Sequence, residues 1–157
     1  MASESPLCTV FGQCGGCEYQ HISYADELSI KNSKLREIFF KNLPDLDSKI
    51  IFPIIQSPKE YHYRHRLDLK LKKTKVHNVF IGFTPKSGRG VVEVDACPLA
   101  MKPVSDFIPT LKLEAEQKLQ PKYRQANLVV KTGEDNHVRW GGIGRRSCQL
   151  SEDKYLW

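Results

Sequence analysis

An alternating stretch in the middle of the chain constrains the fold most. In residues 61–72, YHYRHRLDLKLK, every second residue is Tyr, His or Leu, and the residues between them are almost all charged. Successive side chains of a β-strand point to opposite faces of a sheet. The stretch therefore predicts a strand with Leu67, Leu69 and Leu71 in the core. Its other face should meet water, an anionic partner or both.

Further strands are predicted after this stretch. VHNVFIGF at 76–83 and VVEV at 91–94 follow at short intervals and are separated by polar turn residues. Together with 61–72 they predict an antiparallel meander. NLVVKT and HVRWG are linked by GEDN, which predicts a hairpin over 127–141.

Two helices are predicted to flank the sheet. Apolar residues recur at helical spacing from Tyr24 to about Asn42, and a second helix is predicted between Pro103 and Leu119, interrupted by Pro109. KIIFPII at 49–55 is rich in β-branched residues but contains a proline, which predicts an edge strand or a bulge. The predicted class is α+β: an antiparallel meander with flanking helices and an irregular N-terminal loop.

That N-terminal loop, residues 1–23, carries three cysteines in the glycine-rich segment CTVFGQCGGC. The chain has five cysteines in all, Cys8, Cys14, Cys17, Cys97 and Cys148. An odd number without a signal segment argues against a secreted disulfide framework and predicts reduced thiols in a cytoplasmic protein. A thioredoxin-type pair would need a strand before the CxxC and a helix opening on it, and neither is present.

Two kinds of metal site remain for these thiols. A zinc ribbon normally pairs two knuckles of closely spaced cysteines, whereas Cys97 and Cys148 are single and distant. An iron–sulfur cluster accepts several thiolates from one loop and a last one from far along the chain. The local pattern favours a cluster and leaves zinc open.

Composition adds a modest argument for a polyanionic partner. Twenty-four Lys and Arg against 18 Asp and Glu give a net charge of +6 and a pI near 9.1. No apolar run approaches the roughly 18 residues of a membrane helix, so no membrane partner is predicted.

Four segments in matching order resemble one enzyme family. They are CTVFGQCGGCEYQHISYADELSIKNSKL, YHYRHRLDLKL, VFIGFTPKSGRGVVEV and DACPLA. The segments are similar to the iron–sulfur RNA (uracil-5-)-methyltransferases, which act on ribosomal RNA and, in related members, on transfer RNA. The resemblance implies a 4Fe-4S cluster with Cys8, Cys14, Cys17 and Cys97 as ligands. It runs from about Leu7 to Met101 and more loosely to about Gly142.

The chain also departs from the family pattern. Family members usually begin with an RNA-binding β-barrel called TRAM and end with a domain that binds S-adenosyl-L-methionine (AdoMet), and neither is found here. GGIGRR at 141–146 lacks the acidic residue expected of a dinucleotide loop and is interpreted as a turn. The family's catalytic Ser-Cys-Asn-Pro motif is incomplete at Cys148, which is interpreted as a structural cysteine. AdoMet is therefore expected only in the parent enzyme, and this chain alone should be inactive.

The expected organisation is an iron–sulfur loop at 1–23, a central RNA-binding domain at 24–142 that completes the cluster site at Cys97, and a tail at 143–157. The resemblance implies RNA as partner, with ribosomal RNA first and transfer RNA as the other candidate. A second reading is a free-standing iron–sulfur RNA-binding or electron-transfer module. The helix at 24–42 could expose an apolar stripe that a homodimer or a domain exchange would cover.

The predicted RNA contacts lie on the polar face of the alternating stretch. Strand geometry spaces alternate side chains about 6.6 to 7 Å apart, close to the distance between successive phosphates. The candidates are Arg64, Arg66, Lys70, Lys72 and Lys73. The alternative is a solvated face on an edge strand, where Lys prevents aggregation. Tyr61, Tyr63 and Trp140 could stack on bases or lie in the core.

Overall fold

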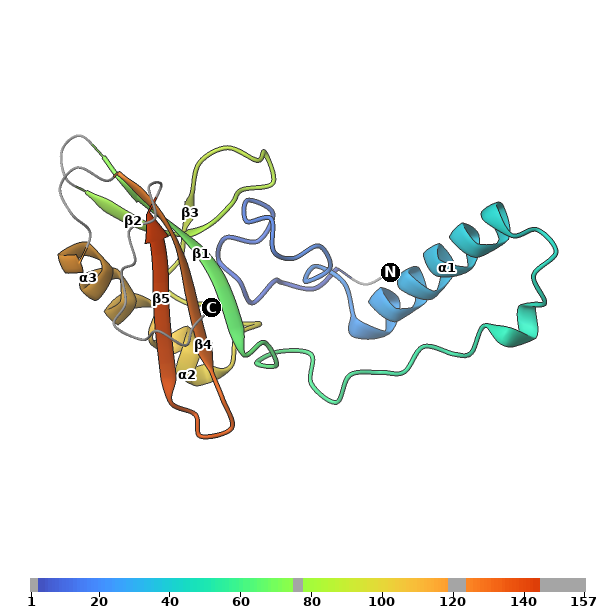
Figure 1. Ribbon diagram of the computed structural model, residues 1–157. Helices are drawn as coiled ribbons and strands as arrows, with labels where there is room; N and C mark the ends of the chain where they lie inside the picture. Colours follow the sequence, from blue (N-terminus) through green and yellow to red (C-terminus); the bar gives the residue numbers. More distant parts are fainter. Residues whose placement is uncertain (1–2, 75–77, 119–123, 145–157) are drawn as a thin grey trace.

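The computed structural model describes residues 3–74, 78–118 and 124–144 of the 157 (Figure 1). One antiparallel sheet organises the chain, with the strand order β3-β2-β1-β4-β5. Its strands are β1 (Arg66–Lys73), β2 (Val79–Phe83), β3 (Val92–Glu93), β4 (Gln125–Thr132) and β5 (Val138–Gly144). The α+β class, the meander and the C-terminal hairpin are confirmed. Because β5 runs through 141–144, the interpretation of GGIGRR as a turn is wrong for those residues.

Strand β1 is the centre of the sheet, paired with β2 on one side and with β4 on the other. Leu67, Leu69 and Leu71 are each 1% exposed, whereas the residues between them are exposed, so the predicted alternation is confirmed from residue 66. A central strand has no free edge to protect. The edge position assumed in the alternative is therefore wrong, whereas a solvated charged face stays the alternative to RNA contact.

The sheet packs one face on two short helices, α2 (Lys102–Asp106) and α3 (Ile108–Lys118). The interruption predicted at Pro109 falls at Phe107, between the two helices. In α3 the buried residues are Ile108, Leu111 and Ala115, spaced to share one side of a helix. They join Leu67, Leu69, Leu71, Leu128 and Val130 in one core.

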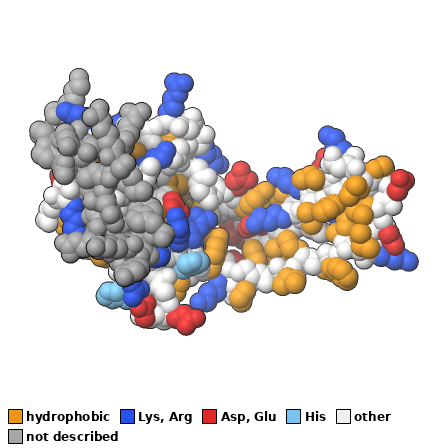
Figure 2. Space-filling model, in the orientation of Figure 1, with side chains coloured by type: hydrophobic (Ala, Val, Ile, Leu, Met, Phe, Trp, Pro, Cys, Tyr) orange, Lys and Arg blue, Asp and Glu red, His pale blue; other side chains and the backbone are white. Residues whose placement is uncertain are grey.

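Helix α1 (Tyr24–Asn42) begins at its cap Ser23, whose hydroxyl accepts a hydrogen bond from the Asp26 amide at 3.1 Å. The predicted helix is confirmed, but none of its residues is buried. With the chain that follows, it forms an arm beside the sheet, and apolar side chains gather on this arm (Figures 1 and 2).

The segment after α1 is irregular apart from one turn of 3-10 helix, η1 (Ser48–Ile50). No strand forms at 49–55, so the predicted edge strand or bulge is wrong. Phe52 is 79% exposed and Ile55 is 93% exposed. These β-branched and aromatic residues lie on the arm, where no sheet partner reaches them. Among the described helices, none is long and apolar enough to cross a membrane.

Candidate metal centre

The N-terminal cysteine loop is fastened to the loop between β2 and β3 by backbone hydrogen bonds. The Gly15 amide donates to the Thr84 carbonyl at 3.1 Å, and the Lys86 amide donates to the Gln13 carbonyl at 2.9 Å. The crossing is tight at Gly15, because a β-carbon there would lie 3.1 Å from the Thr84 oxygen and the neighbouring backbone would have to shift by a few tenths of an ångström. Two loops more than sixty residues apart in sequence are thereby brought together.

Cys97 reaches the same place from the other side. It lies in the turn between β3 and α2 and is 8% exposed. Its amide donates to the Ser105 hydroxyl at 2.9 Å, and its carbonyl accepts a hydrogen bond from the Ala100 amide at 3.0 Å. The buried Ser105 on α2 therefore fixes the backbone that carries this thiol.

Four thiols from these two segments line one small cavity. They belong to Cys8, Cys14, Cys17 and Cys97, and all four are free. Apolar side chains complete much of the wall, namely Val10, Phe11, Phe83, Val94, Pro98 and Leu99. Cys14 is also buried, whereas Cys8 and Cys17 are half-buried. The structure thus places around one cavity the four cysteines that the family resemblance implies as ligands. Cys148 lies outside the described residues.

Burial keeps two of these thiols protonated. Desolvation is the largest cause that raises the pKa of Cys14 above 9.0, and the neighbouring Cys8 and Cys97 raise it further. The Gly16 amide, which donates to the Cys14 sulfur at 3.4 Å, and the Arg64 guanidinium act in the opposite direction. Desolvation likewise raises the pKa of Cys17. Metal binding must therefore displace protons from these thiols.

Gln20 joins two parts of the cysteine loop through the two ends of its side-chain amide. Its nitrogen donates to the Cys17 sulfur at 3.3 Å, and its oxygen accepts a hydrogen bond from the Cys8 amide at 3.1 Å. The bond to sulfur lowers the pKa of Cys17 against the effect of burial. Cysteine spacing carries no signal for this residue or for Ser105, and sequence reasoning missed both.

The donor set fits an iron–sulfur cluster in its chemistry. The cavity lining has four thiols and no imidazole or carboxylate, as in clusters held by four Cys thiolates. Within the described part of the chain, no group of three or more His, Cys, Asp or Glu side chains is placed to hold a metal ion. A tetrahedral zinc site would need neighbouring sulfurs about 3.8 Å apart, since each Zn–S bond is about 2.3 Å. The described thiols, as they are placed, do not form such a group.

The cavity is smaller than a cluster. Its volume of about 20 Å³ has room for about one water molecule. The thiols must therefore move apart to take four irons. Gly12, with a φ of +85°, gives the loop a backbone conformation that other residues rarely adopt. The identity of the metal stays a prediction.

The predicted RNA-binding residues divide into two groups. Arg66, Lys70 and Lys72 are exposed on one face of β1, and Lys73 at the end of the strand is half-buried. Arg66 forms an ion pair with Asp68 at 2.7 Å. The lysines on this face have no such partner among the ion pairs of the described residues.

Arg64 does not belong to that face, and its predicted exposed position on the strand is wrong. Its amide donates to the Leu99 carbonyl at 2.8 Å and its carbonyl accepts from the Met101 amide at 2.8 Å, so it pairs with the chain after Cys97. The side chain is half-buried and lines the cysteine cavity. Arg64 lies at the cysteine cavity because its backbone pairs with a segment that is distant in sequence. The alternating pattern of residues 61–72 cannot predict such pairing.

The chain is similar in sequence to several RNA methyltransferases. The chain is 36% identical over 110 residues to the 23S rRNA (uracil(1939)-C(5))-methyltransferase RlmD of Shewanella piezotolerans. The aligned region covers 68% of this chain and 24% of that protein. It is 29% identical over 131 residues to the tRNA (uracil(54)-C(5))-methyltransferase of Schizosaccharomyces pombe, covering 79% of this chain and 24% of that protein. It is also 32% identical over 139 residues, 82% of this chain and 30% of the other, to an RNA methyltransferase of Clostridium tetani named as uncharacterized.

No protein-family model matches the chain. The chain spans about a quarter of the length of the first two relatives. Those two relatives are named for methylation of uracil at C5, one in ribosomal and one in transfer RNA. The chain therefore belongs to the RNA uracil-C5 methyltransferase family, as the sequence resemblance predicts, and matches one part of its members.

Proposed function

We propose that this chain is the cluster-binding and RNA-recognising part of an AdoMet-dependent RNA uracil-C5 methyltransferase that acts on 23S ribosomal RNA. The observation that carries the proposal is the cavity lined by Cys8, Cys14, Cys17 and Cys97, which come from two distant segments. The relatives named for 23S rRNA support the choice of ribosomal RNA.

The roles of the residues follow from their positions. Cys8, Cys14, Cys17 and Cys97 would hold a 4Fe-4S cluster, whose irons would cross-link the N-terminal loop to the turn after β3. Gln20 and the Gly16 amide direct hydrogen bonds at two of the sulfurs, which favours the thiolate form of those ligands. The chain's own part in methylation is to bind and orient RNA.

RNA would meet the exposed face of β1. Lys70 and Lys72 project from the same side of the strand, so their charges lie about 7 Å apart, close to the spacing of phosphates. Arg66 shares its charge with Asp68 and should contribute less. Contacts of this kind give affinity without sequence preference.

The proposal is tested by anaerobic purification. The protein should be brown, with about four irons and four sulfides per chain. Cys97→Ser should lose most of both. Cys148→Ser, the same change at the fifth cysteine, should retain them. Full iron content in Cys97→Ser, or zinc in place of iron in the wild type, would contradict the cluster assignment.

RNA recognition is tested separately on the same preparation. The wild-type protein should bind single-stranded RNA in a filter assay, with an affinity that falls as salt rises. Absence of binding at low salt would contradict this part of the proposal and leave the metal result standing.

A further inference from the structure

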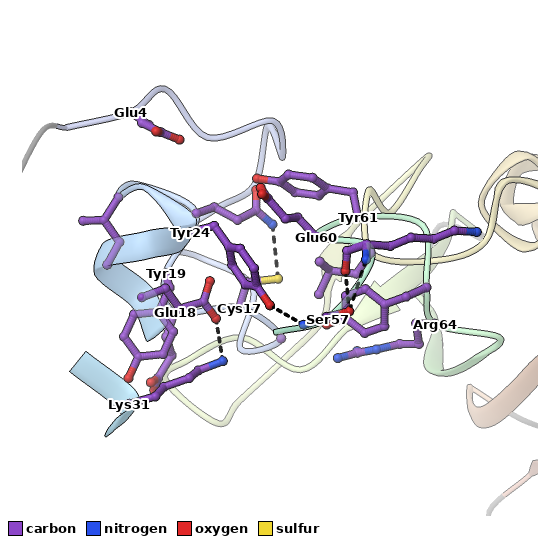
Figure 3. A pocket seen from close by; sticks show the side chains of 17 residues that line it. Glu4, Cys17, Glu18, Tyr19, Tyr24, Lys31, Ser57, Glu60, Tyr61 and Arg64 are labelled. Atoms are coloured by element: carbon purple, nitrogen blue, oxygen red, sulfur yellow. Dashed lines mark hydrogen bonds and ion pairs between the residues drawn. The ribbon is translucent and has the colours of Figure 1, made fainter. Parts of the chain in front are cut away.

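A second cavity adjoins the cysteine cavity on the side of α1 (Figure 3). It has a volume of about 340 Å³, which is within the range of small-molecule sites. Four tyrosines line it: Tyr19, Tyr24, Tyr61 and Tyr63. We call this cavity the tyrosine pocket. Cys17, Gln20 and Arg64 line both cavities, so the pocket and the proposed cluster site share a wall.

Hydrogen bonds join the segments of the chain that line the tyrosine pocket. The Tyr24 hydroxyl accepts a hydrogen bond from the Ser57 amide at 2.8 Å, which joins the start of α1 to the segment before β1. The Tyr19 hydroxyl accepts from the Lys34 ammonium at 3.0 Å. The backbone beside Tyr63 is fixed on both sides, because the amides of His62 and Arg64 donate to the chain after Cys97.

The charges of the pocket argue against a phosphate ligand. Its lining has three cationic side chains, Lys31, Lys59 and Arg64, and four carboxylates, Glu4, Glu18, Glu27 and Glu60. Phosphate is bound by sites with excess positive charge. A neutral base suits this lining better, since its amino and imino groups can donate to carboxylates while its ring stacks on an aromatic side chain.

Tyr63 is the best placed of the four rings for stacking. Its side chain is 48% exposed, whereas the other three tyrosines are only partly exposed. Tyr19 already has Lys31 and Lys34 over its ring, at 5.4 and 5.5 Å from the centroid. Tyr63 therefore offers the most accessible ring of the four.

A shallow groove leads from the pocket to the charged face of the sheet. It is lined by Arg64, His65, Arg66, Asp68 and Phe83. Arg64 belongs to both the groove and the pocket. Through Arg64 the pocket is thus continuous with Arg66 and Asp68, at the start of the exposed face of β1.

We propose that the tyrosine pocket takes one unstacked base of an RNA strand, with Tyr63 as the stacking surface. This rests on the proposed RNA-binding function and adds a base site to it. Stacking on an aromatic side chain contributes to affinity for any base and releases no counterions. It is therefore separable from phosphate contacts by the salt dependence of binding.

The test uses a short single-stranded RNA of mixed sequence with a fluorescent label at one end. Tyr63→Leu should weaken binding about 5- to 10-fold, since base stacking on an aromatic ring contributes at least this much. The slope of affinity against salt should stay unchanged. Tyr63→Phe keeps the ring and should bind as the wild type does. Because Tyr63 is half exposed, neither change should alter the thermal melt.

An abasic scan of the same RNA identifies the base. In the wild type, one abasic position should weaken binding by about the same factor as Tyr63→Leu. In Tyr63→Leu that position should cost nothing further, because the stacking partner is already gone. Equal losses at that position in both proteins, or wild-type affinity in Tyr63→Leu, would overturn the base site while wild-type binding still supports the RNA function.

Two other outcomes also decide the matter. If the wild-type protein binds no RNA, the proposed function and the base site fail together. Free uridine and adenosine should show no saturable binding to the protein at the concentrations at which the RNA saturates it. Binding of a free nucleoside more tightly than the RNA would make the pocket a small-molecule site and overturn the proposal.

Discussion

Replacement of Ser105 by Ala tests whether α2 positions the turn that carries Cys97. The Ser105 hydroxyl is buried and accepts the hydrogen bond of the Cys97 amide at 2.9 Å. Ala has no acceptor, so this buried amide loses its partner. An unsatisfied buried donor costs about 1 to 3 kcal/mol, and we take about 2 kcal/mol here. For a domain of this size each kcal/mol lowers the melting temperature by roughly 2 to 4 °C, so a fall of roughly 4 to 8 °C is expected.

The assay is thermal unfolding of the metal-free protein under reducing conditions, followed by circular dichroism. Thr110→Ala on α3 is the matched control, because it also removes a hydroxyl from a helix but at an exposed position. Its stability should stay within about 0.5 kcal/mol of the wild type. A Ser105→Ala melt that coincides with the wild-type melt would refute the role given to this hydrogen bond.

Three further predictions concern the sheet, the hairpin turn and the basic face. Gly82→Ala should destabilise the protein by at least the 1 to 3 kcal/mol typical of overpacking, measured by urea unfolding, because the new β-carbon would lie 1.8 Å from the Val92 carbonyl oxygen. The hydrogen bond from Arg139 holds the pKa of Asp135 below 3.8, so its contribution to stability is present above that pH and is lost as the pH falls through the lowered pKa. Asp135→Asn should therefore be less stable than the wild type at pH 5. The difference in unfolding free energy should disappear at lower pH, where Asp135 is protonated. Lys72→Ala should lower the salt slope of RNA binding by about 0.7, the value for one phosphate of a single strand, whereas Lys102→Ala on α2 should leave it unchanged.

The alternation of residues 66–72 was sufficient to predict β1 and its buried leucines. It could not predict where the strand begins, because the same alternation continues back to Tyr61. The backbone leaves the sheet there, since the amides of His62 and Arg64 donate to carbonyls of Pro98 and Leu99. The central position of β1 was also beyond the pattern, because it depends on pairing with β4 some sixty residues later.

The candidate site was predictable to a similar extent. Spacing grouped Cys8, Cys14 and Cys17, and the family resemblance added Cys97. Ser105 and Gln20 were not predictable, because each is defined by the atom it contacts in space. KIIFPII failed for a related reason: its β-branched residues have strand propensity, but the fold offers that segment no neighbouring strand.

The pairing of β1 with β4 limits how early the sheet can be completed during synthesis. The central strand lacks one neighbour until residues as far as Lys131 have been made, because Arg66 pairs with Lys131. Cys17 precedes Cys97 by 97 − 17 = 80 residues. At 5 to 20 residues per second, translation leaves the first three thiols without the fourth for about 4 to 16 seconds. Under the proposed cluster assignment, the complete set of four ligands therefore exists only after Cys97 has been synthesised.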